Sequence, residues 1–233
     1  MNTIIKECEK IITNLIRFGN YESRIYMINH EKKLIYLINP KVACTSLKAN
    51  LFNCNTKYHE RIHSILWAHG KNEIAKKDFE NYFIYTYVRN PFERLVSCYK
   101  NKVCQQKHYY DSYLFGFILP DKGFDSFVNK IFFIPDFLSD RHFRSQYSLI
   151  YKKGKCMVDF IGKIETIKES FPKLAKKYNL SSLQYYNTTK KNNWMDYYTI
   201  STAKKVYKRY KKDFKIFGYN KYYYELINYL KNK

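Results

Sequence analysis

The chain has 233 residues, of which 45% are hydrophobic and 19% aromatic, so it can bury a sizeable core. This composition excludes an intrinsically disordered chain and predicts one domain over residues 1–233. The formal net charge of +22 suits anionic partners such as nucleotides, acidic glycans, nucleic acid or a membrane surface. Because the lysines are scattered along the chain, compositional drift in an AT-rich genome accounts for most of that charge.

Apolar residues at helical spacing predict an amphipathic helix over residues 2–18. Two apolar runs, residues 24–28 and 34–38, are separated by a polar segment and are typical of strands, which a hairpin would join. A helix is expected over residues 44–53. The aromatic and β-branched run over residues 82–88 then predicts a buried strand.

A second helix opens at Pro91, because proline is tolerated in the first helical turn. Its apolar stripe consists of Phe92, Leu95, Val96, Tyr99 and Val103. Farther along, we expect helices over residues 124–133, 166–178 and 202–217, and a core strand over residues 156–164. Strands that alternate with helices indicate an α/β layered fold around a parallel sheet.

Residues 39–48, Asn-Pro-Lys-Val-Ala-Cys-Thr-Ser-Leu-Lys, follow the predicted strand that ends near residue 38. They lack the Gly-x-x-x-x-Gly-Lys-Ser/Thr pattern of a phosphate-binding loop. A helix start that offers backbone N–H groups, the hydroxyls of Thr45 and Ser46, and the ammonium of Lys41 can nevertheless bind an anion. This segment therefore predicts a phosphate or sulfate site without glycine.

The segment that follows the strand over residues 82–88 offers a second set of anion ligands. Arg89 stands at the strand end and Ser97 lies on the next helix, a guanidinium fork and a hydroxyl. Two anion sites at adjacent strand-to-helix corners indicate one doubly phosphorylated nucleotide. No pair of aspartates suited to magnesium accompanies them, which argues against ATP-dependent phosphoryl transfer.

Four ordered segments resemble one family, the carbohydrate sulfotransferases that use 3′-phosphoadenosine 5′-phosphosulfate. The similarity is greatest to the group with the chondroitin 4-O and natural-killer-epitope enzymes, and the heparan 2-O enzymes are more distant. Residues 39–48 resemble the family's 5′-phosphosulfate loop, and residues 87–102 its 3′-phosphate motif, Arg-x-Pro-Phe-x-Arg-Leu-Val-Ser-x-Tyr. Residues 159–165 and 210–219 resemble its Asp-Phe-Ile-Gly-Lys-x-Glu strand and its closing Tyr-x-x-Asp-Phe-x-x-Phe-Gly-Tyr helix.

The resemblance implies a three-layer P-loop-like fold with a central parallel sheet flanked by helices. It also implies a sulfotransferase whose cofactor is 3′-phosphoadenosine 5′-phosphosulfate and whose nucleotide product is adenosine 3′,5′-bisphosphate. Lys41 would act in catalysis by steadying the bridging oxygen as the sulfuryl group leaves. A polar loop with Thr188 and Lys190 resembles one that closes over the nucleotide, although an ordinary turn explains it equally well. The residues implied at the nucleotide are Lys41, Val42, Ala43, Cys44, Thr45, Ser46, Leu47, Arg89, Ser97, Thr188 and Lys190.

Transfer to a hydroxyl needs a general base, and histidine is the natural choice near neutral pH. His63 fits the family's place for the base best, with His69, His59 and His142 as alternatives. Residues 140–146 resemble a stretch that lines the family's acceptor cleft. The resemblance thus implies an acceptor site with His69, Arg141, His142 and Arg144.

A structural role explains Arg94 at least as well as a role in the active site does. Trp67 and Trp194 either stack on a sugar ring or belong to the core. Two other classes of protein stay open: a basic nucleic-acid-binding protein, and a nucleotide kinase with a degenerate phosphate loop. The expected partners are the nucleotide donor and a carbohydrate acceptor, including acidic sugars, with no nucleic acid.

The six cysteines show neither Cys-x-x-Cys spacing nor histidines at zinc spacing, so we expect free thiols and no metal site. The N-terminus lacks the pattern of a secretory leader. No apolar run reaches the roughly 18 to 20 residues that a membrane span needs. These features predict a cytoplasmic, bacterial relative, while peripheral attachment to a membrane and a removed N-terminal anchor stay open.

Overall fold

The computed structural model describes residues 2–18, 24–53, 80–106, 108–111, 113–118, 122–183 and 193–233. The chain divides into two compact units, which are described separately. The sheet unit comprises the described parts of Arg24–Arg89 and Ile150–Lys190. The helical unit comprises the described parts of Met1–Ser23, Asn90–Leu149 and Lys191–Lys233.

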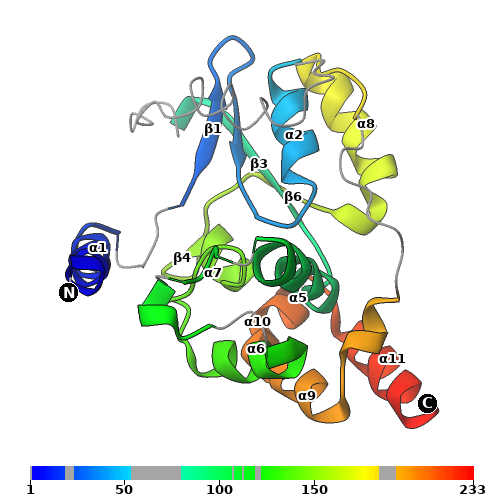
Figure 1. The fold of residues 1–233 in the computed structure, drawn as a ribbon. Helices are drawn as coiled ribbons and strands as arrows, with labels where there is room; N and C mark the ends of the chain where they lie inside the picture. The colour runs from blue at the N-terminus through cyan, green and yellow to red at the C-terminus, as the bar shows by residue number, and fades with distance from the viewer. Residues whose placement is uncertain are drawn as a thin grey trace. The chain divides into compact units, whose positions relative to one another are not determined.

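The sheet unit is built on four strands in the order β1-β2-β3-β6 (Figure 1). The first two pair antiparallel as a hairpin, and β2, β3 and β6 run parallel. The strands are β1 (Tyr26–Asn29), β2 (Leu34–Leu37), β3 (Phe83–Val88) and β6 (Phe160–Lys163), and a separate hairpin pairs β4 (Tyr151–Lys152) with β5 (Lys155–Cys156). The predicted α/β fold with a central, mostly parallel sheet flanked by helices is confirmed.

Two helices of the sheet unit lie along one face of the sheet, α2 (Cys44–Leu51) and α8 (Ile167–Tyr178), the latter preceded by a 3₁₀ turn, Ile164–Thr166 (Figure 1). They bury alternate strand residues, since side chains along a strand point to opposite faces in turn. The resulting core contains Leu34, Tyr36, Tyr85, Tyr87, Leu47, Leu51, Ile167, Phe171 and Leu174.

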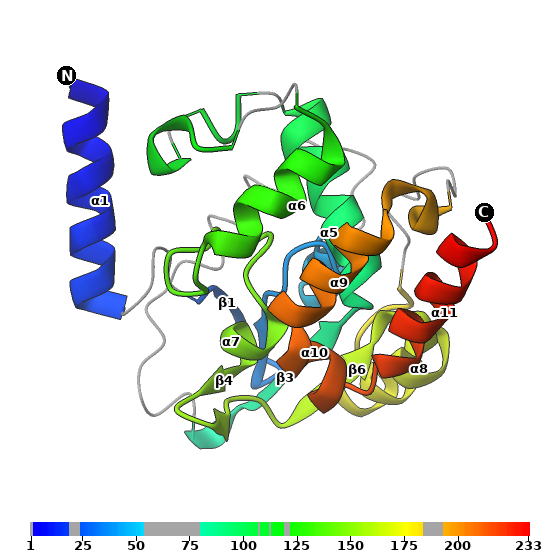
Figure 2. The same cartoon turned by 90° about the horizontal axis from the view of Figure 1, so that it is seen from below.

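The helical unit gathers α5, α6, α9 and α10 around an aromatic core (Figure 2). Phe92 lies at its centre, with Trp194, Tyr198 and Phe214 packed around the ring. The helices are α1 (Asn2–Phe18), α5 (Pro91–Cys98), α6 (Gly123–Phe133), α7 (Gln146–Ile150, which ends in the sheet unit), α9 (Ile200–Arg209), α10 (Lys211–Ile216) and α11 (Asn220–Lys231). Shorter pieces are the π-helix Tyr99–Gln105 and the 3₁₀ turns Tyr113–Gly116 and Trp194–Tyr197.

The predicted stripe of α5 and the π-helix that continues it is confirmed, because all five of its residues are buried: Phe92, Leu95, Val96, Tyr99 and Val103. The apolar face of α1 is different. Ile5, Ile12 and Ile16 are 50%, 57% and 82% exposed. No helix in the described parts of the chain is long and apolar enough to cross a membrane.

Two predicted elements are wrong in their extent. The strand expected over residues 156–164 is split, because β5 ends at Cys156 and β6 begins only at Phe160. The helix expected over residues 202–217 is broken at Tyr210, whose φ of −101° and ψ of 24° lie outside helical geometry. The prediction also missed α11.

Of the cysteines that the structure describes, Cys8, Cys44, Cys98, Cys104 and Cys156 are free thiols. Cys98 is buried, Cys104 is exposed, and the other three are half-buried. The expectation of free thiols therefore holds for these five cysteines.

Candidate active site

The loop between β2 and α2 has an unusual backbone. Lys41 and Ala43 adopt φ angles of 69° and 46°, in the left-handed region that favours glycine. Such conformations cost free energy and persist where the surrounding structure enforces them, often at functional sites. Val42, between them, is fully buried and anchors the loop to the core. The loop thus achieves with ordinary residues a shape usually built with glycine.

Helix α2 begins directly after this loop, and Ala43 is its N-cap. Alanine has no side-chain acceptor, and the first turn of α2 contains no acidic residue. The backbone N–H groups of a helix start carry a partial positive charge that favours anions. Thr45 is half-buried beside this start. Ser46 and Leu47 are buried, and the backbone N–H of Leu47 donates to the carbonyl oxygen of Ala43 at 3.0 Å, so this N–H is used within the helix and Leu47 is not placed to bind a ligand.

The two sequence motifs predicted to bind anions meet within the sheet unit. The guanidinium of Arg89 donates a hydrogen bond from Nη1 to the backbone oxygen of Lys41, at 3.3 Å. Asn39 donates from Nδ2 to the oxygen of Tyr87, at 2.9 Å, and Thr86 donates to the oxygen of Leu37, at 2.8 Å. These bonds hold the carboxyl ends of β2 and β3 together, so Lys41 and Arg89 share one corner, which we call the donor corner.

The remaining predicted nucleotide ligands are placed as follows. Ser97 is half-buried on α5, whose start is capped by Asn90 through a 3.1 Å hydrogen bond from the N–H of Phe92. Ser97 belongs to the helical unit, whereas Lys41 and Arg89 belong to the sheet unit. His59, His63, Trp67, His69, Thr188 and Lys190 lie outside the described residues.

Residues 134–145 of the helical unit form a loop, here the pinned loop, whose carbonyl groups accept hydrogen bonds from buried side chains. The Nη1 and Nη2 atoms of Arg94 donate to the carbonyl oxygens of Arg144 and Arg141, at 2.8 and 3.1 Å. Arg144 itself donates from Nε and Nη2 to the oxygen of Ser139, at 3.1 and 2.7 Å. The guanidinium groups of Arg94 and Arg144 thus brace the backbone of the loop.

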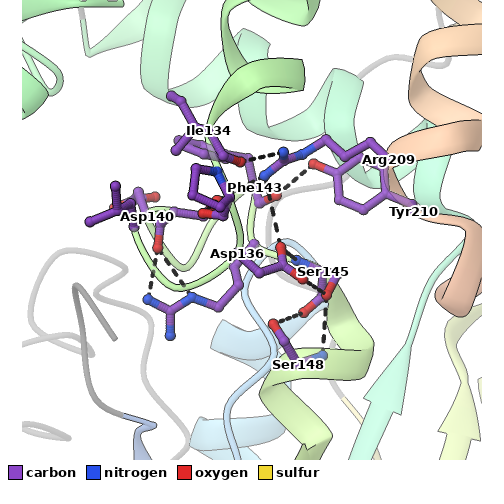
Figure 3. A network of polar contacts seen from close by, with 12 residues as sticks. Ile134, Asp136, Asp140, Phe143, Ser145, Ser148, Arg209 and Tyr210 are labelled. Carbon is purple, nitrogen blue, oxygen red and sulfur yellow. Dashed lines mark hydrogen bonds and ion pairs between the residues drawn. The ribbon is translucent and has the colours of Figure 1, made fainter. Parts of the chain in front are cut away.

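Residues 209–219, here the closing segment, include the motif over residues 210–219 and also brace this loop (Figure 3). Arg209 donates to the carbonyl oxygen of Ile134, at 2.5 Å, and the hydroxyl of Tyr210 donates to that of Phe143, at 2.5 Å. Ser145 donates to Asp136 within the loop. Since a buried polar group left unsatisfied costs free energy, these bonds select one conformation of the loop.

Asp213, also in the closing segment, is fully buried. Its two carboxylate oxygens accept the backbone N–H groups of Gln146 and Tyr147, at 2.8 and 2.7 Å. Burial raises the pKa of Asp213 to about 7, even though these hydrogen bonds and Arg94 act in the opposite direction. Asp213 therefore ties the start of α7 to α10.

Within the pinned loop, Asp140 holds the imidazole of His142. The Nδ1 atom of His142 lies 2.8 Å from Oδ1 of Asp140, and the backbone N–H of His142 donates to the same oxygen at 2.9 Å. Tyr109 lies 3.2 Å from the same Nδ1 atom through its hydroxyl. Burial alone would raise the pKa of Asp140, but the charge and hydrogen bonds of His142 outweigh it and lower the pKa well below its usual range.

The predicted acceptor residues thus differ in what they do. His142 is 17% exposed at its side chain and is oriented by a carboxylate, as an acid–base or substrate-binding histidine requires. Arg144 is 1% exposed and holds Ser139, and this burial favours a structural role. Arg94 is likewise structural. Asp140 was not among the predicted site residues, although its place two residues before His142 was a usable signal.

The motif over residues 159–165 is explained by packing in the sheet unit. Asp159 exchanges hydrogen bonds with Ile84, accepting the N–H at 2.7 Å and donating its own N–H to the carbonyl at 2.8 Å. A side chain at Gly162 would place its Cβ 2.2 Å from the ring of Tyr87. These two residues therefore fix β6 against β3.

The comparisons with known proteins cover most of the chain. The model of the sulfotransferase family matches residues 24–220. Carbohydrate sulfotransferase 12 of Xenopus laevis is 26% identical, over 87% of this chain and 61% of that protein. Carbohydrate sulfotransferase 12 of Mus musculus is 24% identical over the same shares. Carbohydrate sulfotransferase 10 of Homo sapiens is 24% identical, over 85% of this chain and 67% of that protein.

The chain spans about three fifths of the length of the first two of these relatives. No solved structure gives a significant match. The match over residues 24–220 includes the donor corner, the pinned loop and the closing segment. This chain therefore belongs to the sulfotransferase family.

Proposed function

We propose that this protein transfers a sulfuryl group from 3′-phosphoadenosine 5′-phosphosulfate to a hydroxyl of a carbohydrate, by a metal-independent in-line reaction. The observation that supports this most is the donor corner, where the Arg89 guanidinium contacts the backbone of Lys41. One ligand with two anionic ends suits such a corner better than two separate anions. Family membership and relatives named as carbohydrate sulfotransferases favour this reaction over the nucleic-acid-binding and kinase alternatives.

The proposed roles combine the ligands that the family resemblance implies with the contact between Arg89 and Lys41. The start of α2, with Thr45, Ser46 and Lys41, holds the 5′-phosphosulfate, and Arg89 holds the 3′-phosphate. Binding energy at the two phosphates orients the sulfur for attack. Lys41 and the start of α2 stabilise the negative charge that develops on the departing phosphate, which supplies the charge compensation that a metal ion gives in other transferases.

In the proposed reaction, the acceptor oxygen forms a bond to sulfur while the bond from sulfur to the bridging phosphate oxygen breaks. The hydroxyl proton passes to a histidine, and adenosine 3′,5′-bisphosphate leaves. His63 is the proposed base. His142 is the alternative, and its support is the carboxylate of Asp140, which fixes the orientation and tautomer of the ring.

The test is transfer of labelled sulfate from the nucleotide donor to a panel of neutral and acidic carbohydrates. We expect transfer by the native protein. Replacing the base by alanine should lower turnover about 10²- to 10⁴-fold with nucleotide affinity retained. Comparing His63→Ala with His142→Ala identifies the base, because only one of them should show this pattern. No transfer to any carbohydrate by a protein that binds the nucleotide product would contradict the proposed acceptor class.

A further inference from the structure

The sheet unit contains a cavity of about 390 Å³ between α8 and the sheet. It lies at the amino ends of β3 and β6, since Phe83 and Phe160, the first residues of these strands, form part of its wall. The donor corner follows the carboxyl end of β3. Strands rise about 3.3 Å per residue, so the six residues of β3 place the two features roughly 17 Å apart. The cavity is therefore separate from the donor corner.

The walls of this cavity combine half-exposed aromatic rings with charged and hydroxyl side chains. Leu174, Phe83 and Phe160 are its apolar part. The polar part comes from α8 and the residue before it: Thr166, Glu169, Ser170, Lys173 and Lys177. Ligand sites typically have this composition, an apolar surface with a few polar groups that fix orientation.

The lysines give the cavity a net positive charge, because Lys173 and Lys177 face a single carboxylate, Glu169. The Nζ atom of Lys177 lies 4.7 Å from the ring centroid of Phe83 and 5.2 Å from that of Tyr178. An ammonium over the face of an aromatic ring is attracted electrostatically to that ring. A matching ligand has an apolar ring face and an anionic substituent next to it.

We propose that this cavity binds a residue of an acidic oligosaccharide, as a second site that holds the carbohydrate away from the donor corner. The C–H face of the sugar ring packs on Phe83 and Phe160, its sulfate or carboxylate group contacts Lys173 and Lys177, and its hydroxyls bond to Ser170 and Glu169. A chain bound here raises the effective concentration of its other residues around the enzyme. This inference rests on the proposed function for the choice of a carbohydrate as the ligand.

The test is calorimetric titration of the full chain with a size-defined chondroitin 4-sulfate tetrasaccharide. The double variant Lys173→Ala with Lys177→Ala should bind it about tenfold more weakly. The matched control, Lys168→Ala with Lys176→Ala, removes the same charge from exposed positions of α8 outside the cavity and should bind within about twofold of the native protein. Equal weakening in both double variants would overturn the proposal, because general attraction to a basic protein would explain it.

Two further experiments separate the contribution of the aromatic ring of Phe83 to binding from that of the sulfate charge of the ligand. Phe83→Leu, with folding checked by thermal unfolding, should weaken tetrasaccharide binding, and maltotetraose, a neutral tetrasaccharide, should bind more weakly than the sulfated one. Inorganic sulfate that competes as well as the tetrasaccharide would overturn the sugar site in favour of a simple anion site. Unchanged affinity of Phe83→Leu for the tetrasaccharide would also overturn the sugar site.

The outcome is distinguishable from failure of the proposed function. Adenosine 3′,5′-bisphosphate should bind the native protein and the Lys173→Ala, Lys177→Ala variant equally well. If this nucleotide does not bind the native protein while the tetrasaccharide does, the proposed function fails and the cavity assignment stands. If the nucleotide binds and the cavity variant keeps full affinity for the tetrasaccharide, the cavity assignment fails alone.

Discussion

The donor corner and the pinned loop are both rich in basic residues, but they use them differently. In the donor corner, the backbone of Lys41 and Ala43 takes left-handed φ angles and α2 begins without an acidic residue. At the pinned loop, the buried guanidinium groups of Arg94, on α5, and of Arg144, in the loop itself, donate to carbonyl oxygens of the loop. An arginine in a family motif is therefore not by itself evidence of an anion site. Burial and hydrogen-bond partners decide its role.

The largest effect is expected at Lys41. Lys41→Ala should lower turnover about 10²- to 10³-fold, because it removes a charge that stabilises the departing phosphate. Thermal unfolding should change little, since the side chain of Lys41 is only half-buried. Steady-state kinetics measures the effect, and Lys155→Ala, at an exposed lysine of the sheet unit, is the matched control. Turnover within tenfold of the native value would exclude this role for Lys41.

Arg94→Ala tests the structural role of the buried arginines at the pinned loop. It should lower the free energy of unfolding by about 3 kcal/mol, because the carbonyls of Arg141 and Arg144 lose a buried donor. Urea unfolding measures this change. If Arg94 were instead a ligand of the nucleotide, the variant would unfold like the native protein and lose nucleotide affinity.

Asp213 makes stability depend on pH. Because burial raises its pKa to about 7, from 3.8 in the unfolded chain, the folded state binds the proton more tightly. Stability from this group is full below about pH 4 and is lost as the pH rises toward 7, a change on the order of a few kcal/mol. Asp213→Asn should remove this dependence in urea unfolding at pH 5 and pH 8. If the free energy of unfolding changes equally with pH in the native protein and in Asp213→Asn, Asp213 is not the source of the pH dependence.

The smallest effect is expected at Ala43. Ala43→Gly should raise the free energy of unfolding by roughly 1 kcal/mol, since glycine adopts the φ of 46° without steric cost. Ala49→Gly, in the interior of α2, should do the opposite because glycine weakens a helix interior. If both variants are destabilised alike, Ala43 carries no strain.

Local pattern predicted the parts of the fold that local chemistry decides. The hairpin of β1 and β2, the buried strand β3 and the stripe of α5 follow from the alternation and helical spacing of apolar residues. The break at Tyr210 escaped because apolar residues continue at helical spacing through both α9 and α10. What places Tyr210 is its hydroxyl, which bonds to the carbonyl of Phe143, 67 residues away.

In the candidate site, too, local sequence pattern did not predict which side chains contact each other. Residue type and resemblance brought together Lys41 and Arg89, and the structure places them in contact. The same reasoning could not distinguish Arg144, which is buried within its own loop, from an arginine that faces a substrate. It also left Asp140 unassigned, although an aspartate two residues before a histidine is a signal that the sequence offers.

The central claim is that the donor corner binds one nucleotide through both of its anionic ends. Calorimetry with adenosine 3′,5′-bisphosphate on the native protein and on Arg89→Lys and Arg89→Ala tests it most directly. We predict clear binding to the native protein, weaker binding to Arg89→Lys, which keeps the charge but loses the fork, and none to Arg89→Ala. No binding to the native protein, or equal affinity in all three, would contradict the account.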